Sequence, residues 1–248
     1  MSIWALADLH LSISNPDKDM AIFGPVWKDY MTRIATNWKE RVQPHDLVLI
    51  PGDTSWASSL DDAMPDLLWL DKLPGQKLLI RGNHDPWWAS LTKMNRLLPP
   101  SLHALHNTAW LWHDVAIGGS RLWDSTEYTF QDYIIKKDNP KATKDLSAPY
   151  STDDEKIFLR ELDRLRMSLQ NLAPHARVRI AMTHYPPIGP LLIPSKASQI
   201  LEEFSVDICV FGHLHSIRPH SLAFGTLGTT TYKLVSADYV DFAPVLIL

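Results

Sequence analysis

The chain has 248 residues, of which 45% are hydrophobic, and its formal net charge is −4. This length fits one sizeable α/β domain, and the hydrophobic content is sufficient for a core. No block of the sequence is rich in lysine and arginine. The composition therefore does not support binding to a nucleic-acid backbone through bulk electrostatics, and we do not expect a nucleic-acid partner.

Targeting and redox features of the sequence are few. No apolar run reaches membrane-spanning length, and no charged start is followed by the hydrophobic core of a signal peptide. The single cysteine, Cys209, excludes an internal disulfide and is typical of a reducing compartment. We expect no membrane association, a cytoplasmic location, and an inert core role for Cys209.

The first half of the chain alternates short apolar runs with amphipathic segments. The apolar runs predict strands at residues 3–7, 47–50 and 77–80. Segments with apolar side chains every three or four residues predict helices at residues 26–42, 58–72 and 88–98. The expected apolar face of the second helix consists of Leu60, Met64, Leu67 and Leu68.

The second half begins with an expected antiparallel hairpin, residues 109–112 and 115–118. Residues 124–150 are polar and irregular, and we interpret them as an inserted loop or lid. Thr152 and Glu155 have the spacing of a capping box before a long amphipathic helix. Further strands are expected at residues 178–182 and 208–211 and in the tail, 225–248. Without repeats or linkers, we expect one domain spanning residues 1–248.

Five motifs rich in aspartate, histidine and asparagine follow the expected strands. They are Asp8-x-His10, Gly52-Asp53, Gly82-Asn83-His84-Asp85, Thr183-His184 and Gly212-His213-x-His215. Ligands gather beyond the carboxyl ends of strands in open α/β sheets, so these side chains are expected to meet. Carboxylates and imidazoles suit divalent transition metals, and a shared carboxylate can hold two such ions. The set indicates hydrolysis, with a phosphate ester as the expected substrate.

The order of these motifs resembles that of the calcineurin-like metallophosphoesterase superfamily: D-x-H, G-D, G-N-H-[D/E], H and G-H-x-H. The resemblance covers nearly the whole chain, from residue 8 to residue 215. Residues 4–10 and 81–88 also resemble a bacterial subgroup of predicted phosphohydrolases. The resemblance implies an α/β fold, a layered α-β-β-α sandwich of two mixed sheets flanked by helices, with the metal site at one edge.

The resemblance also implies ligands, cofactors and roles. The implied ligands are Asp8, His10 and His215 for a first divalent ion, Asn83, His184 and His213 for a second, and Asp53 as the bridge. Mn²⁺ is the favoured cofactor, with Fe²⁺/Fe³⁺, Zn²⁺ and Ni²⁺ as alternatives. Ions about 3.5–4 Å apart make a bridging hydroxide available for in-line attack on phosphorus. His84 is the expected general acid, with Asp85 orienting it from behind.

Several alternatives stay open for single residues. Asp85 could instead cap the following helix. Asn83 and Arg121 are candidate substrate contacts. Arg81 could contact phosphate or form an ion pair outside the site, and Trp87 could stack on substrate or pack in the core.

For the whole protein, the alternative is a catalytically silent scaffold or binding protein of the same fold. Such superfamily members typically lose the catalytic histidine or several ligands, whereas this chain retains His84 and the full set. We expect a small-molecule phosphate ester or a nucleotide as substrate. The motifs do not separate phosphomonoesterase from phosphodiesterase, and they predict no oligomeric state.

Overall fold

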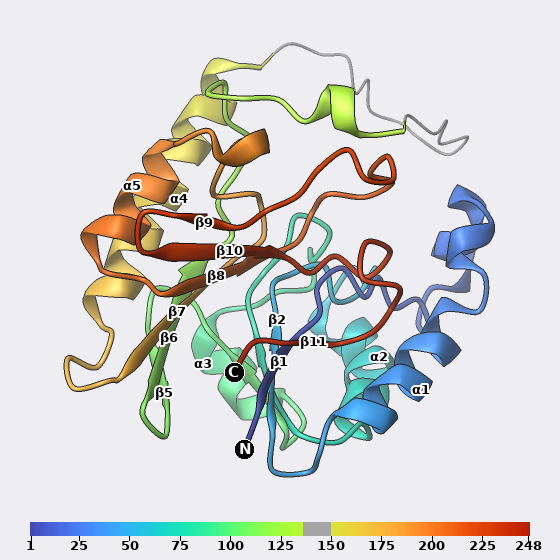
Figure 1. Cartoon of the computed structure of the whole chain (residues 1–248). Helices are drawn as coiled ribbons and strands as arrows, with labels where there is room; N and C mark the ends of the chain where they lie inside the picture. The colour runs from blue at the N-terminus through green and yellow to red at the C-terminus, as the bar shows by residue number, and fades with distance from the viewer. Residues whose placement is uncertain (136–149) are drawn as a thin grey trace.

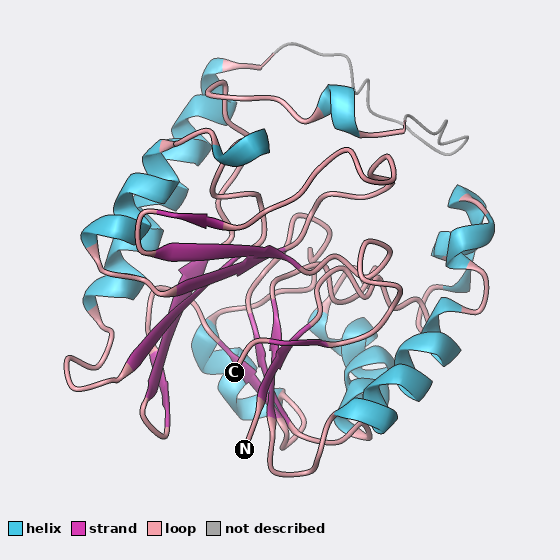
Figure 2. Ribbon diagram, in the orientation of Figure 1, coloured by secondary structure: helices cyan, strands magenta, loops and turns pink. Residues whose placement is uncertain are grey.

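The computed structural model describes residues 1–135 and 150–248 (Figure 1). Two mixed β-sheets pack face to face, and helices cover both outer faces (Figure 2). This architecture confirms the predicted α-β-β-α sandwich. Most of the predicted insertion, 124–150, lies outside the described residues. No helix of the described part is long and apolar enough to cross a membrane.

The first sheet has the strand order β11-β1-β2-β3-β4. Its strands are β1 (Ile3–Ala5), β2 (Leu47–Ile50), β3 (Gln76–Leu79), β4 (Leu102–Ala104) and β11 (Val245–Leu246). The first four are parallel, and β11 runs antiparallel to β1, which brings the two chain termini close together in Figure 1. The strand β4 was not predicted, because three residues are too few for a pattern to register.

The second sheet has the strand order β5-β6-β7-β8-β10-β9. Its strands are β5 (Trp110–Trp112), β6 (Val115–Ser120), β7 (Val178–Thr183), β8 (Ile208–Phe211), β9 (Thr226–Leu227) and β10 (Thr230–Leu234). The pairing of β5 with β6 is antiparallel, so the predicted hairpin is confirmed. Strands β6, β7, β8 and β10 are parallel, and their carboxyl ends share one edge.

Helices cover the outer faces of both sheets. They are α1 (Tyr30–Arg41), α2 (Leu60–Asp71) and α3 (Leu91–Leu97) on the first sheet, and α4 (Thr152–Gln170) and α5 (Lys196–Glu203) on the second. Short 3₁₀ helices span Pro16–Lys18, Met20–Phe23, Pro25–Trp27, Gln131–Tyr133 and Pro190–Leu192. The helix α5 was not predicted, because its eight residues follow an irregular proline-containing segment.

Two predicted helices begin later than their apolar pattern suggests. Asp29 adopts a left-handed φ of 53°, so α1 begins at Tyr30 rather than at residue 26. The side chain of Ser90 accepts a hydrogen bond from the backbone N–H of Lys93, so α3 begins after Ser90 rather than at residue 88.

Two finer details of the predicted helices were also wrong. The capping box of α4 joins Ser151 and Asp154, one residue before the predicted pair. In α2, Leu68 is 48% exposed, because the buried face runs through Leu67 and Leu70 instead.

The two sheets also touch through backbone hydrogen bonds at the edge where the motifs lie. The N–H of Ala7 donates to the carbonyl of Val235 at 2.8 Å, and the N–H of Ala237 donates to the carbonyl of Ala7 at 3.0 Å. Between the sheets, the core includes Leu49 and Met182, both fully buried. This packing fixes the strand ends of both sheets relative to one another.

Candidate metal centre

The loops that follow β1 and β2 run side by side and carry the first two motifs. The N–H of Asp8 donates to the carbonyl of Gly52 at 3.1 Å, and the N–H of His10 donates to that of Asp53 at 3.0 Å. Asp8, His10 and Asp53 have φ values of 59°, 45° and 52°, and His213 has 73°. Left-handed backbone is unfavourable for such residues and is typical of functional sites.

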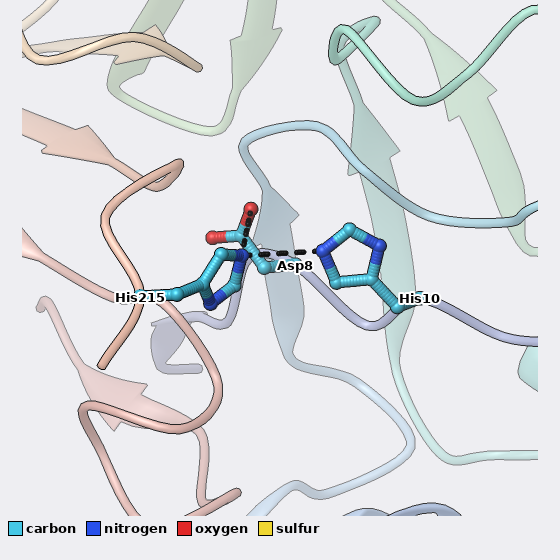
Figure 3. A group of neighbouring side chains, drawn as sticks. All are labelled: Asp8, His10 and His215. Carbon is cyan, nitrogen blue, oxygen red and sulfur yellow. Dashed lines mark hydrogen bonds and ion pairs between the residues drawn. The ribbon is translucent and has the colours of Figure 1, made fainter. Parts of the chain in front are cut away.

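Asp8, His10 and His215 bring their ligand atoms within 4.8 Å of one another (Figure 3). The Nε2 atoms of His10 and His215 are 3.2 Å apart, and His215 Nε2 lies 3.6 Å from Asp8 Oδ1. This is the side-chain set expected for the first ion.

The orientation of His215 is set by a carboxylate that the sequence did not single out. His215 Nδ1 donates to Asp238 Oδ1 at 2.7 Å, and Asp238 Oδ2 accepts the N–H of Ser216 at 2.8 Å. Burial alone would lower the pKa of His215, but the carboxylates of Asp238 and Asp8 raise it well above its ordinary value. A histidine whose outer nitrogen binds a carboxylate is the usual arrangement for a metal ligand.

The three side chains expected for the second ion meet at the amide of Asn83. Asn83 Oδ1 lies 2.6 Å from His184 Nε2 and 3.1 Å from His213 Nδ1. His184 Nδ1 lies 2.9 Å from the carbonyl of Pro51, which can only accept, so this nitrogen carries the proton. Nε2 of His184 and Oδ1 of Asn83 are then two acceptors that face each other without a proton to share. A cation bound by both atoms would satisfy them.

Burial determines the charge state of His184. It lowers the pKa of His184 to about 4, against the opposing charge of Asp8. The ring is therefore neutral at pH 7 and keeps its lone pair available for coordination.

Asp53 lies between the two groups. Its Oδ2 is 3.7 Å from His10 Nε2, and its Oδ1 is 3.5 Å from His184 Nε2. Burial and the charges of Asp85 and Asp8 raise the pKa of Asp53 well above its ordinary value. An ionised carboxylate in this position therefore requires a nearby cation.

Asp8 also belongs to both groups, which the sequence did not predict. Ligand atoms of Asp8, Asp53 and His184 all lie within 4.8 Å of one another. Burial would raise the pKa of Asp8, but the rings of His215, His184 and His10 lower it below its ordinary value. Two carboxylates therefore lie at the centre of the site, surrounded by imidazoles.

Asp85 joins two motif loops. Its carboxylate accepts four hydrogen bonds, from the N–H groups of Thr54 (2.9 Å), Ser55 (3.1 Å) and Gly82 (2.8 Å) and from Trp87 Nε1 (2.8 Å). The alternative of a helix cap is wrong, because Ser90 caps α3. The packing interpretation of Trp87 is confirmed, since it is 2% exposed. The orienting role expected for Asp85 towards His84 stays a prediction.

Two motif glycines have no room for a side chain. A Cβ on Gly82 would collide with the backbone nitrogen and carboxylate of Asp53, and a Cβ on Gly212 would lie 2.5 Å from Asp8 Oδ2. Glycine at these two positions therefore prevents crowding beside the carboxylates of Asp53 and Asp8.

His84 stands at the solvent side of the site. Its backbone N–H donates to Asp53 Oδ1 at 2.8 Å, and its ring centroid lies 4.4 Å from that of Trp56. Desolvation, together with the charges of His184 and His215, lowers the pKa of His84 to about 4. Trp56 also stacks on His10, with centroids 4.9 Å apart. Trp56 was not predicted as a site residue, because it lies outside every motif.

Arg121 and Arg81 line a small cavity beside β6. The guanidinium of Arg121 is 3.3 Å from Glu161 Oε1, and its carbonyl accepts the N–H of His184 at 3.2 Å. Arg121 thus supports the backbone of His184, and substrate contact by Arg121 or Asn83 stays a prediction. Arg81 forms no ion pair among the described residues, so both alternatives for Arg81, phosphate contact and an ion pair outside the site, stay predictions.

Comparison with known proteins gives one family and several relatives. A family model described as calcineurin-like phosphoesterase matches residues 1–216. The gene 66 protein of Mycobacterium phage D29 is 36% identical over 100 residues, which cover 39% of this chain and 48% of that protein. The match thus spans about half the length of this curated relative.

Two solved structures align with this chain across almost their whole length. Phosphopantetheinyl hydrolase from Mycobacterium tuberculosis has a TM-score of 0.56 at 14% identity, with 100% of this chain and 95% of that chain covered. A protein of unknown function from Aquifex aeolicus has a TM-score of 0.49 at 16% identity, with 99% and 95% covered.

Proposed function

We propose that this chain, which belongs to the calcineurin-like phosphoesterase family, hydrolyses a phosphate ester with the help of two divalent cations. The observation that carries this proposal is the position of Asp53 between two groups of neutral or charged metal donors. Facing lone pairs, such as Nε2 of His184 and Oδ1 of Asn83, support the presence of cations in the working enzyme.

The side chains suit such ions by type as well as by position. One ion would be held by Asp8, His10 and His215, the other by Asn83, His184 and His213, with Asp53 shared. Mixed oxygen and imidazole donors fit Mn²⁺, our first choice, and also iron, Zn²⁺ and Ni²⁺. Two bound ions would polarise the phosphoryl oxygens and acidify a water molecule.

The chain's own side chains would perform the remaining steps. We assign proton donation to the leaving oxygen to His84, whose ring is packed on Trp56 at the rim of the site. The negative charge of a bound phosphate would raise the pKa of His84 from about 4 towards neutrality. Asp238 and the carbonyl of Pro51 would hold the outer protons of His215 and His184.

A small-molecule ester is the substrate class that we propose, and a nucleotide is included in that class. The structural neighbour named as a phosphopantetheinyl hydrolase supports an organic phosphate, although it shares only 14% identity. A silent scaffold is disfavoured, because His84 and all seven metal donors are retained.

A substrate screen tests the proposal. The Mn²⁺-loaded protein should release phosphate or alcohol from at least one ester among phosphomonoesters, phosphodiesters and cyclic nucleotides. Asp53→Asn, purified in parallel, should be inactive and serves as the control for contaminating phosphatases. The proposal fails if metal analysis shows two bound ions but no ester is hydrolysed with Mn²⁺, Fe²⁺, Zn²⁺ or Ni²⁺.

A further inference from the structure

A cavity of about 700 Å³ opens beside the candidate metal centre. Its wall includes Val26, Ile135, Ile217, Arg218, Asp238 and Tyr239. The volume lies within the range of about 300–1,000 Å³ that is typical of small-molecule sites. None of these residues belongs to a motif, so the cavity is not part of the ligand set described above.

Asp238 lies both in the wall of the cavity and beside the metal centre. One oxygen of Asp238 accepts the proton of His215 Nδ1, and Asp238 itself forms part of the cavity wall. Ser216, the residue after His215, is also in the wall. The cavity therefore lies on the outer side of His215, next to the metal centre.

The wall combines apolar side chains with the guanidinium of Arg218. Val26, Ile135 and Tyr239 are 37%, 44% and 40% exposed, although large apolar side chains are usually buried. The guanidinium of the exposed Arg218 has no ion-pair partner among the described residues. Apolar surface with a few polar groups that fix orientation is the usual composition of a ligand pocket.

We infer that this cavity binds the alcohol portion of the phosphate ester, a large and partly apolar group with a second anionic group that pairs with Arg218. The inference rests on the proposed phosphoesterase function and adds the substrate class. The apolar wall would contact the body of the alcohol. The guanidinium of Arg218 would bind an oxyanion, for which its planar donors are well suited.

Binding of a fluorescent nucleoside diphosphate, N-methylanthraniloyl-ADP, to the Mn²⁺-loaded protein tests the inference. Ala223 lies in the wall and is exposed, so Ala223→Trp should fill the cavity without disturbing the core. We expect its Kd for the probe to rise at least about tenfold, since the added indole occupies the volume that the ligand needs. Thr229→Trp, an exposed site outside the wall, is the matched control and should bind as the wild type does.

A second pair of variants tests the charge. Arg218→Ala should weaken binding of the probe by roughly 10-fold or more, because it removes a charge-assisted hydrogen bond. Arg160→Ala, which removes an exposed arginine from α4, should not change it. p-Nitrophenyl phosphate has no second anionic group. Its kcat/KM should therefore fall less in Arg218→Ala than the affinity for the fluorescent probe does.

The outcomes separate the two proposals. Wild-type affinity in Ala223→Trp and Arg218→Ala, or no binding by the wild type at millimolar probe, overturns the cavity inference and leaves the phosphoesterase proposal standing. If binding depends on these residues but no phosphate ester is ever hydrolysed, the proposed function fails, and the assignment of the cavity to an ester falls with it.

Discussion

Two histidines of the site, His215 and His184, differ in the group that binds the outer ring nitrogen. The outer nitrogen of His215 donates to a carboxylate, Asp238, at 2.7 Å, whereas that of His184 lies 2.9 Å from a neutral carbonyl. The pKa of His215 is raised well above its ordinary value, and that of His184 is lowered to about 4. The two halves of the centre are therefore not equivalent. We expect the half around His215 to bind a cation more tightly.

The largest effect should come from Asp53→Asn, since Asp53 contacts both halves. A carboxamide offers only one good oxygen donor, so the affinity for at least one ion should fall. Substituting a residue that only hydrogen-bonds a metal ligand typically costs about 10–100-fold in affinity, and we expect a larger loss here. Metal analysis and Mn²⁺ titration calorimetry would measure this loss. Two fully occupied ions together with unchanged activity would contradict the bridging assignment.

His84→Ala should separate chemistry from metal binding in both halves. The variant should keep both ions and lose on the order of 10²–10⁴ in kcat, because proton donation to the leaving oxygen is removed. The loss should be smaller for nitrophenyl esters, whose leaving groups need little protonation. His103→Ala, which changes a histidine paired with Gln76 away from the site, is the control. Equal losses for good and poor leaving groups would argue against a general acid.

Asp238→Asn tests the comparison directly. Loss of this carboxylate should weaken Mn²⁺ binding by about 10–100-fold in the half around His215. The half around His184, whose support is a backbone carbonyl, should change little. Calorimetry that resolves two binding steps should therefore show one step shifted. If both steps weaken equally, the two halves do not differ in the way we infer.

The smallest effect is expected from Asn83→Asp, which adds a negative charge to the half around His184. Affinity should rise roughly tenfold there, since ligand charge is one determinant of affinity for divalent ions. The two Mn²⁺ binding steps would then move closer together in a titration. An unchanged weaker step would show that ligand charge does not cause the difference between the halves.

Sequence reasoning identified the side chains that converge at the site, because each motif follows a strand whose end lies at the same edge. It missed Asp238 and Trp56, since their roles depend on where the chain returns in space rather than on local spacing. For Asp85, adjacency to His84 suggested one contact, whereas its carboxylate accepts four donors elsewhere. Helix starts differed from the prediction because of local backbone geometry, such as the left-handed conformation of Asp29. A periodic pattern of apolar residues carries no information about such a conformation.

The metal donors between residues 8 and 83 follow strands of the first sheet, and those between residues 184 and 215 follow strands of the second. The backbone of Ala7 already links the two sheets. A cation held between them would bind only while both sheets are in place. Its binding free energy would therefore add to the free energy of global unfolding rather than to that of opening either sheet alone. Chelation should therefore lower hydrogen-exchange protection in β2 and β8 by a similar amount, because both strands exchange through the global unfolding that the cation opposes.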